Sequence, residues 1–173
     1  MTSPTKLAHV VLQTNQMAVL RDWYCQLLDA HVQHADDFLT FLTYDDEHHR
    51  IAIAQSPTPL PERSPNAVGV NHVAFTFATI HDLCDKYEQL KADGVLPWWT
   101  IKHGPSLSMY YRDADGNNVE LQVDAYESLE ECNEFMRGPL FAANPLGVDF
   151  DPEQLVAELR AGVAVADLLR RTQ

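Results

Sequence analysis

The sequence has little cysteine, and the cysteines it has are scattered. Cys25, Cys84 and Cys132 lie far apart in the chain and form no Cys-x-x-Cys pair. Three residues are too few for a disulfide framework, and their spacing does not favour a thiolate metal site. We therefore expect buried, reduced thiols in a cytoplasmic protein.

Long apolar runs are also missing. No stretch of about eighteen apolar residues occurs, so we expect no membrane span. The first residues lack the basic segment and the apolar segment of a signal peptide, so none is predicted. With 173 residues, of which 46% are hydrophobic, the chain is long enough to bury one sizeable core.

Positive charge is scarce as well. The chain has 12 Lys and Arg residues against 25 Asp and Glu residues, which gives a net charge of −13. Binding to nucleic acid or to an anionic membrane depends on clusters of Lys and Arg. The composition therefore predicts neither nucleic acid nor a membrane as a partner.

What the sequence does contain is an internal repeat. When His9 is placed on His72, an offset of 63, further identities follow. They are Val10 with Val73, Leu20 with Leu83, Asp22 with Asp85, Tyr24 with Tyr87, Gln26 with Gln89 and Val32 with Val95. The offset later grows to 68, where Ile53 aligns with Leu121. The second copy therefore has about five extra residues, which we place in a loop near residues 102–107.

Each copy has the pattern of a strand, an amphipathic helix and three short strands. In the first copy we expect these elements at residues 7–13, 18–28, 30–34, 38–44 and 50–54. In the second copy we expect them at residues 70–77, 81–92, 95–100, 107–112 and 118–124. Asp-Ala-Asp-Gly at 113–116 predicts a hairpin turn, and four prolines within residues 56–65 indicate a linker.

The predicted fold class is α+β, with two paired βαβββ modules that form a metal-holding cup. The modules cover about residues 5–55 and 68–124 of one domain, 1–125, and residues 126–173 form a C-terminal helical extension. A helix over 126–137 should end at Gly138-Pro139, and Asp151 before Pro152 should begin another. We expect this extension to pack on the domain or to make a dimer contact, with a lid over the cup as the alternative.

Strand alternation brings three candidate metal ligands to one face. In residues 119–123 the apolar side chains face one way, and Glu120 faces the other. His72 alternates in the same manner with its apolar neighbours, and His9 occupies the equivalent position of the first copy. If each module buries its apolar face under its helix, the opposite faces line a cup that contains His9, His72 and Glu120.

Two imidazoles and one carboxylate are the ligands of non-haem Fe(II) oxygenases, which keep metal positions open for substrate and O₂. In the first copy the position that aligns with Glu120 is Ala52, so only three protein ligands are available. A glutamate between two apolar strand residues needs a partner or a metal if it is enclosed. The pattern therefore predicts one divalent metal, Fe(II), with Mn(II) as the alternative.

Over about residues 5–124 the chain resembles the vicinal-oxygen-chelate superfamily and, within it, one-domain extradiol dioxygenases of the 2,3-dihydroxybiphenyl type. The resemblance rests on His9, His72, Glu120, on Tyr110 ten residues before the glutamate, and on the run His48-His49-Arg50-Ile51-Ala52-Ile53-Ala54. In that family a histidine from the first strand of each module and a glutamate from the last strand hold Fe(II). The resemblance therefore implies these ligand roles for His9, His72 and Glu120.

The resemblance also implies the catalytic residues and the reaction. It assigns acid/base chemistry to His49 and a hydrogen bond to the metal-bound substrate to Tyr110. His48 and His103 are alternatives for the acid/base role, and His103 is also a candidate to support the site from the inserted loop. The implied reaction is the opening of a catechol or aryl-catechol ring beside its hydroxyl groups, with O₂, during aromatic hydrocarbon catabolism.

The same residues are also compatible with other functions. A glyoxalase-type lyase or isomerase usually has a fourth protein ligand, which Ala52 does not supply, whereas an epoxide-opening enzyme manages with three. A non-catalytic small-molecule-binding protein of this fold would lack the three ligands. The expected partners are thus a catechol and O₂, and we expect the chain to form a homo-oligomer.

Overall fold

The computed structural model describes residues 2–64 and 68–171, and the chain divides into two compact units. Pro65, the last residue of the predicted linker, lies outside the described residues. The first unit, residues 1–68 with 113–117, contains β1 (Val10–Thr14), α1 (Met17–Leu28), β2 (His31–Ala35), β3 (Leu39–Thr43) and β4 (Ile51–Gln55). The second unit, residues 69–112 with 118–173, contains β5 (His72–Thr76), α2 (Ile80–Ala92), β6 (Trp99–Lys102), β7 (Ser106–Arg112), β8 (Asn118–Asp124), α3 (Leu129–Arg137), α4 (Pro139–Ala143), β9 (Val148–Asp149), α5 (Pro152–Arg160) and α6 (Val165–Leu169).

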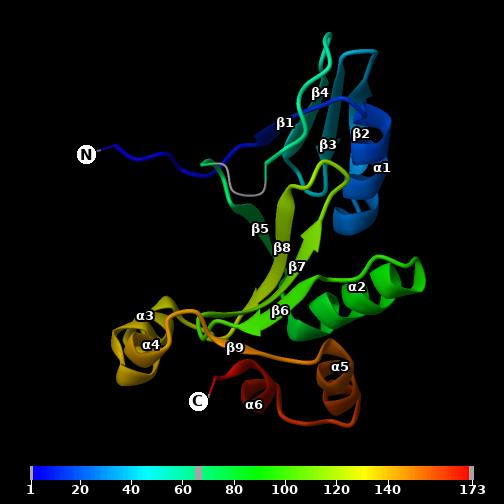
Figure 1. The fold of residues 1–173 in the computed structure, drawn as a ribbon. Coiled ribbons are helices and arrows are strands. Elements are labelled where there is room, and N and C mark those ends of the chain that lie inside the picture. The colour runs from blue at the N-terminus through cyan, green and yellow to red at the C-terminus, as the bar shows by residue number, and fades with distance from the viewer. Residues whose placement is uncertain (1, 65–67, 172–173) are drawn as a thin grey trace. The chain divides into compact units, whose positions relative to one another are not determined.

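The first unit is a four-stranded sheet with one helix against it (Figure 1). The strand order is β1-β4-β3-β2, in which β1 is parallel to β4 and the other pairs are antiparallel. Residues three and four apart share one face of a helix, so α1 buries Leu20, Tyr24 and Leu27 together. Helix α1 contacts β3 and β4, whose Leu42, Ile51 and Ile53 are buried as well.

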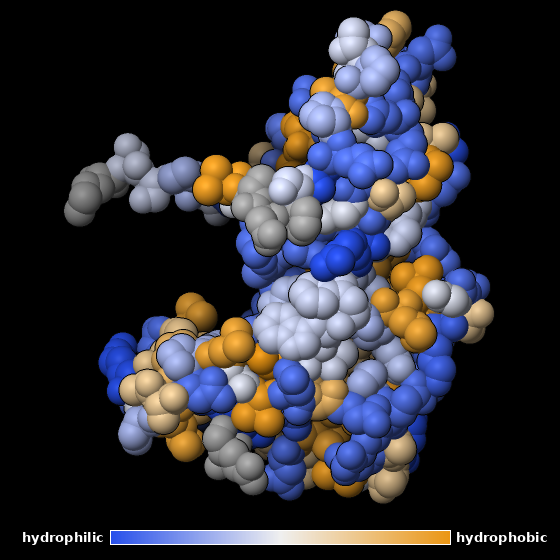
Figure 2. Space-filling view, in the orientation of Figure 1, coloured by the Kyte–Doolittle hydropathy of each residue, from blue (hydrophilic) through white to orange (hydrophobic). Residues whose placement is uncertain are grey.

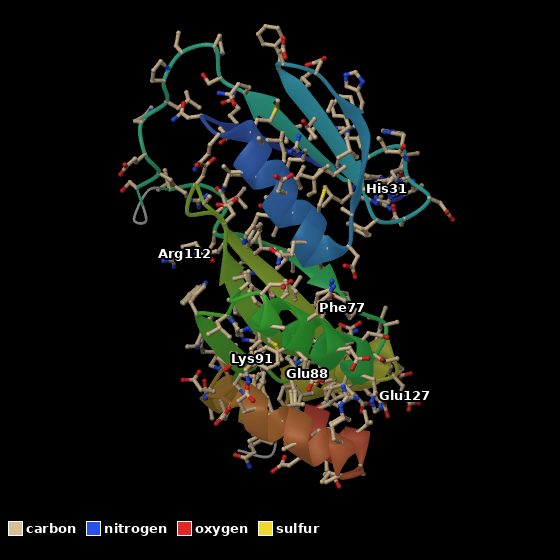
Figure 3. The ribbon with its side chains drawn as sticks, turned by 90° about the vertical axis from the view of Figure 1, so that its right-hand side faces the viewer. His31, Phe77, Glu88, Lys91, Arg112 and Glu127 are labelled. Atoms are coloured by element: carbon tan, nitrogen blue, oxygen red, sulfur yellow. The ribbon has the colours of Figure 1, made fainter. Side chains whose placement is uncertain are left out.

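The second unit repeats this arrangement and adds to it. Its strand order is β5-β8-β7-β6-β9, again with a parallel pair, β5 and β8, beside antiparallel neighbours. Helix α2 begins at a cap, because the Thr79 hydroxyl accepts a hydrogen bond from the Asp82 amide. The outer face of α2 meets α5, where Lys91 pairs with Glu153 at 2.5 Å and Glu88 with Arg160 at 2.6 Å (Figure 3).

Strand pairing confirms the internal repeat. Val11 pairs with Ala52 in the first sheet, and Ala74 pairs with Glu120 in the second, so the offsets are 63 for the first strands and 68 for the last. The β2–β3 pair His34 and Phe41 corresponds to the β6–β7 pair Trp99 and Tyr110. Across this hairpin the offset rises from 65 to 69. Four of the extra residues therefore extend the β6–β7 hairpin, as the prediction for residues 102–107 requires.

The turn at 113–117 connects β7 with β8 yet belongs to the first unit. The Asp113 carboxylate accepts a hydrogen bond of 3.2 Å from the Tyr24 hydroxyl and further bonds from the backbone amides of Asp115 and Asn117. Gly116, with φ of +80°, supplies the left-handed backbone that such a turn needs. The predicted turn is therefore confirmed, and its aspartate anchors it to α1.

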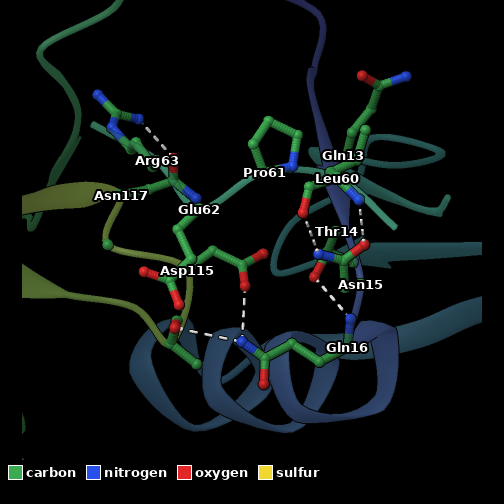
Figure 4. Close-up of a pocket in the computed structure, with 12 residues that line it drawn as sticks. Gln13, Thr14, Asn15, Gln16, Leu60, Pro61, Glu62, Arg63, Asp115 and Asn117 are labelled. Atoms are coloured by element: carbon green, nitrogen blue, oxygen red, sulfur yellow. Dashed lines mark hydrogen bonds between the residues drawn. The ribbon is translucent and has the colours of Figure 1, made fainter. Parts of the chain in front are cut away.

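Polar side chains attach the linker and this turn to the start of α1 (Figure 4). The Asn15 side chain donates to the Leu60 carbonyl and accepts from the Leu60 amide, and the Gln16 side chain donates to Asp115. The space between them is a cavity of about 670 Å³, lined mainly by polar groups. Because the side-chain amides of Asn15 and Gln16 already bond to the chain itself, they hold the linker and the turn against the start of α1.

Several boundaries differ from the prediction. The strand predicted at 95–100 begins only at Trp99, because α2 ends in a turn at Gly94, with φ of +79°, and Pro97 has no amide to donate. Helix α3 begins at Leu129 rather than at residue 126, because Ser128 caps it by accepting from the Glu131 amide. The short β9 was not predicted at all.

The C-terminal segments cluster with the second unit. Asp151 caps α5 by accepting from the Glu153 amide, which confirms the predicted helix start. Helices α3 and α4 bury no side chain fully, and Leu129, Met136 and Leu140 are exposed. Apolar side chains appear on the surface over these helices (Figure 2). Within the described ranges no helix has the length and apolar character to span a membrane.

Candidate active site

The candidate site in the second unit begins with the two faces of its sheet. Alternate side chains of β8 point to opposite faces, and Glu120 shares its face with Gln122. Gln122 donates a hydrogen bond of 2.9 Å to Thr76, which lies on β5 in line with His72. The predicted grouping of His72 and Glu120 on one face is thereby confirmed within this unit.

Glu120 is a buried acid with an imidazole beside it. Its side chain is 5% exposed, and its Oε2 lies 2.9 Å from Nε2 of His72, whose side chain is 35% exposed. The other ring nitrogen of His72 lies 2.8 Å from the Asn71 side-chain oxygen, which fixes the ring orientation. A carboxylate with so little exposure needs such partners, because an isolated charge in an apolar interior is strongly unfavourable.

Tyr110 lies directly across the ladder from Glu120, on β7. Its hydroxyl hydrogen-bonds to the Glu120 carboxylate, and its ring meets His72 edge-on with centroids 5.3 Å apart. The Trp99 ring stacks on Tyr110 at 4.9 Å and donates from Nε1 to Asp149 at 2.9 Å. Burial raises the pKa of Tyr110, and the nearby Glu120 carboxylate raises it further, so the phenol stays protonated near neutral pH.

His103 joins this cluster from the extended hairpin. Its Nε2 lies 2.9 Å from the Tyr110 hydroxyl, and its Nδ1 lies 2.5 Å from the carbonyl oxygen of Leu146. The sequence offered no spacing that fixed His103, and the structure places it one hydrogen bond from Tyr110. His72, Glu120, Tyr110 and His103 thus form a continuous polar chain in the second unit.

The first unit brings together the other predicted residues. The rings of His9 and His49 lie with centroids 4.3 Å apart, and Phe41 stacks on His49 at 4.6 Å. Nδ1 of His48 lies 2.6 Å from Nδ1 of His49. Desolvation lowers the pKa of His49, and the neighbouring His9 and His48 lower it further.

Strand alternation alone would have put His49 with the apolar side chains of the first sheet. The structure avoids this because β4 begins only at Ile51, so the alternation does not extend back to His49. Arg50 fixes the chain just before β4, since its guanidinium donates to the Asp45 carboxylate and to the carbonyls of Leu7 and Ala8. Sequence reasoning missed Arg50, which fixes the segment just before His9.

Ala52 occupies the position of the first copy that matches Glu120. It pairs with Val11 on one side and with Phe41 on the other, and it is 3% exposed. Its methyl group offers no metal ligand.

The donor set of the second unit suits a divalent cation. Glu120 and His72 supply an oxygen and a nitrogen 2.9 Å apart, and oxygen and imidazole ligands are those that Fe(II), Mn(II) and Zn(II) accept in proteins. Within residues 2–64 and 68–171, no three His, Cys, Asp or Glu side chains form a metal-holding group. His9, the third predicted ligand, belongs to the first unit.

The comparisons with known proteins agree with this description. Residues 6–121 match the family model "Glyoxalase/Bleomycin resistance protein/Dioxygenase superfamily". The chain is 48% identical over 165 residues to biphenyl-2,3-diol 1,2-dioxygenase 2 of Rhodococcus globerulus, covering 95% of this chain and 87% of that protein. It is 45% identical to biphenyl-2,3-diol 1,2-dioxygenase 3 of the same organism, covering 99% of this chain and 90% of that protein.

A solved structure supports the fold. A lactoylglutathione lyase from Agrobacterium tumefaciens aligns with a TM-score of 0.56 and 17% identity, covering 70% of this chain and 96% of that chain. The predicted α+β class and the resemblance to the dihydroxybiphenyl-type enzymes are both confirmed. The chain belongs to the glyoxalase/bleomycin resistance protein/dioxygenase superfamily.

Proposed function

We propose that this protein is a metal-dependent extradiol dioxygenase that opens the ring of an aryl-substituted catechol with O₂. The observation that carries the proposal is the buried Glu120 carboxylate, 2.9 Å from His72 and hydrogen-bonded to Tyr110. The two relatives at 45–48% identity, both named biphenyl-2,3-diol 1,2-dioxygenases, support the same reaction and substrate class.

The metal ligands in this proposal are His72, Glu120 and His9, and the metal is Fe(II), with Mn(II) as the alternative. His9 is included because it occupies the repeat position of His72. Because Ala52 would supply no fourth ligand, a bound ion would leave coordination free for a diol and O₂ and would polarise them for reaction.

The chain's own residues then bind and move protons. Tyr110, which stays protonated, donates a hydrogen bond to a hydroxyl oxygen of the substrate or accepts one from it. Nε2 of His103 accepts a hydrogen bond from the Tyr110 hydroxyl when that hydroxyl turns away from Glu120. His49, with a lowered pKa, is neutral near pH 7 and can take a catechol proton as a general base and return it later.

The metal assignment is tested by analysis of protein purified without air. We expect about one metal per chain, and loss of it in His72→Ala and in Glu120→Ala, because each variant removes one of three ligands. His81→Ala, which removes an exposed histidine of α2, is the matched control and should keep its metal. Full metal content in both ligand variants would show that His72 and Glu120 are not metal ligands.

The reaction is tested with an oxygen electrode beside a visible spectrum. Protein loaded with Fe(II), and in parallel with Mn(II), should consume O₂ in step with biphenyl-2,3-diol and yield a coloured ring-opened product. The absence of O₂ uptake with every catechol, together with conversion of a thiol adduct or an epoxide, would transfer the function to the lyase or epoxide-opening class.

A further inference from the structure

The C-terminal extension is attached to the tip of the β6–β7 hairpin, which carries His103. Strand β9 pairs with β6, with Val148 opposite Lys102 and Asp149 opposite Ile101. Just before β9, Gly147 has φ of +122°, and an added Cβ would lie 2.3 Å from the Lys102 carbonyl oxygen. Only glycine allows this approach, so the segment at 144–147 lies directly against the hairpin.

This segment determines which nitrogen of His103 carries a proton. The Leu146 carbonyl can only accept, so Nδ1 of His103, 2.5 Å away, must be the donor. In the neutral ring Nε2 is then the unprotonated nitrogen, and it faces the Tyr110 hydroxyl at 2.9 Å. A backbone group of the extension thereby sets the hydrogen-bonding role of His103 toward Tyr110.

Arg171 holds this arrangement from the end of the chain. Its guanidinium is buried, with the residue 5% exposed, and donates to the carbonyls of His103, Asn144 and Leu140 at 3.1, 2.7 and 2.7 Å. It also lies over the Phe135 ring, 5.3 Å from the centroid. One side chain therefore connects the hairpin, the segment before β9 and α4.

We propose that Arg171 and the Leu146 carbonyl are a positioning device that fixes the tautomer and the ring orientation of His103 against Tyr110. The reason is geometric: His103 stands in a three-residue turn, residues 103–105, outside the strands β6 and β7 that fix its neighbours. A catalytic hydrogen bond loses effect when its partner is held too loosely. The catalytic consequence rests on the function proposed above, whereas the tautomer does not.

The first experiment is therefore NMR of the metal-free protein. Long-range ¹H–¹⁵N correlations of the imidazole should show His103 protonated at Nδ1 in the wild type. In Arg171→Met the two tautomers should average, and Arg171→Lys should retain part of the preference. Arg170→Met, which removes an exposed arginine next in sequence, is the matched control and should leave His103 unchanged.

The second experiment is a double-mutant cycle on turnover of biphenyl-2,3-diol. Arg171→Met should lower kcat by about tenfold or more, with KM within about twofold and metal content unchanged. In a His103→Phe background the same substitution should have no further effect on kcat, because the residue that it positions is absent.

Three results would overturn the proposal: an unchanged tautomer in Arg171→Met, an equal fall in kcat in the His103→Phe background, or an equal effect of Arg170→Met. If Arg171→Met does not fold, as judged by circular dichroism, Arg171→Lys is tested in the same way. If the wild type turns over no catechol, the proposed function fails, and the NMR result still tests the positioning.

Discussion

The two sheets share one strand topology but carry different functional side chains. At matching positions the first sheet has Ala52 and Phe41, and the second has Glu120 and Tyr110. Ala52 is 3% exposed and Glu120 is 4% exposed, so the two positions are equally buried. The difference between the copies therefore lies in the side chains and not in where the backbone puts them.

The aromatic positions show the same division. Phe41 stacks on His49 with an interplanar angle of 15°, and this contact can only pack. Tyr110 instead uses its hydroxyl, which bonds to Glu120 and lies 2.9 Å from His103. In each copy an aromatic ring is paired with a histidine, and in the second copy the aromatic residue itself bonds to a buried carboxylate.

Making the first copy resemble the second should have the largest effect. In Ala52→Glu the new carboxylate fills an open metal position, so O₂ uptake with biphenyl-2,3-diol should fall below detection while metal is retained. Ala52→Gln introduces a similar volume without the charge and serves as the control for steric damage. Retained turnover in Ala52→Glu, with metal bound, would show that Ala52 does not face the metal.

Removing the histidine beside His9 should have the next largest effect. His49→Phe should lower kcat by about a hundredfold, as expected for loss of a general base, while metal content stays unchanged. His48→Phe is the matched control, because His48 lies next in sequence and is the more exposed alternative. If the control loses kcat and His49→Phe does not, the acid/base role belongs to His48.

The smallest effect should come from exchanging the two aromatic residues. Tyr110→Phe gives the second copy the residue of the first and should lower kcat by about tenfold, because one hydrogen bond to the substrate is lost. Phe41→Tyr, the reciprocal change, should leave kcat within about twofold. Steady-state kinetics on both variants tests this prediction. Equal kcat values for the two variants would show that the Tyr110 hydroxyl has no role in turnover.

Much of the fold was predictable because the same pattern of strands and helix occurs in both copies of the repeat. The identities at an offset of 63 and the growth of the offset to 68 predicted two βαβββ units, and strand pairing reproduces both offsets. Alternation in β8 was enough to put Glu120 and His72 on one face, because a strand has a period of two. The resemblance to the dihydroxybiphenyl-type enzymes then supplied the roles that periodicity cannot.

The supporting contacts could not be predicted, and the reason is physical. The partners of His103 and Arg171 are backbone carbonyls, which every residue has, so no side-chain pattern marks them in a sequence. Strand β9 has only two residues, too few for alternation to be seen. Strand alternation did not predict the surroundings of His49, because β4 begins only after Arg50. The partners of Arg50, Leu7 and Ala8, are more than forty residues away in the sequence.

The turn at 113–117 has a consequence for the order in which the protein forms during synthesis. The Tyr24 hydroxyl, in a residue 3% exposed, finds its partner Asp113 only 89 positions further along the chain. At roughly 5–20 residues per second, the ribosome needs on the order of ten seconds to make that stretch. During this interval the Tyr24 hydroxyl lacks the carboxylate with which it pairs in the complete protein. The first unit therefore becomes complete only after residues 69–112 of the second unit have been synthesised.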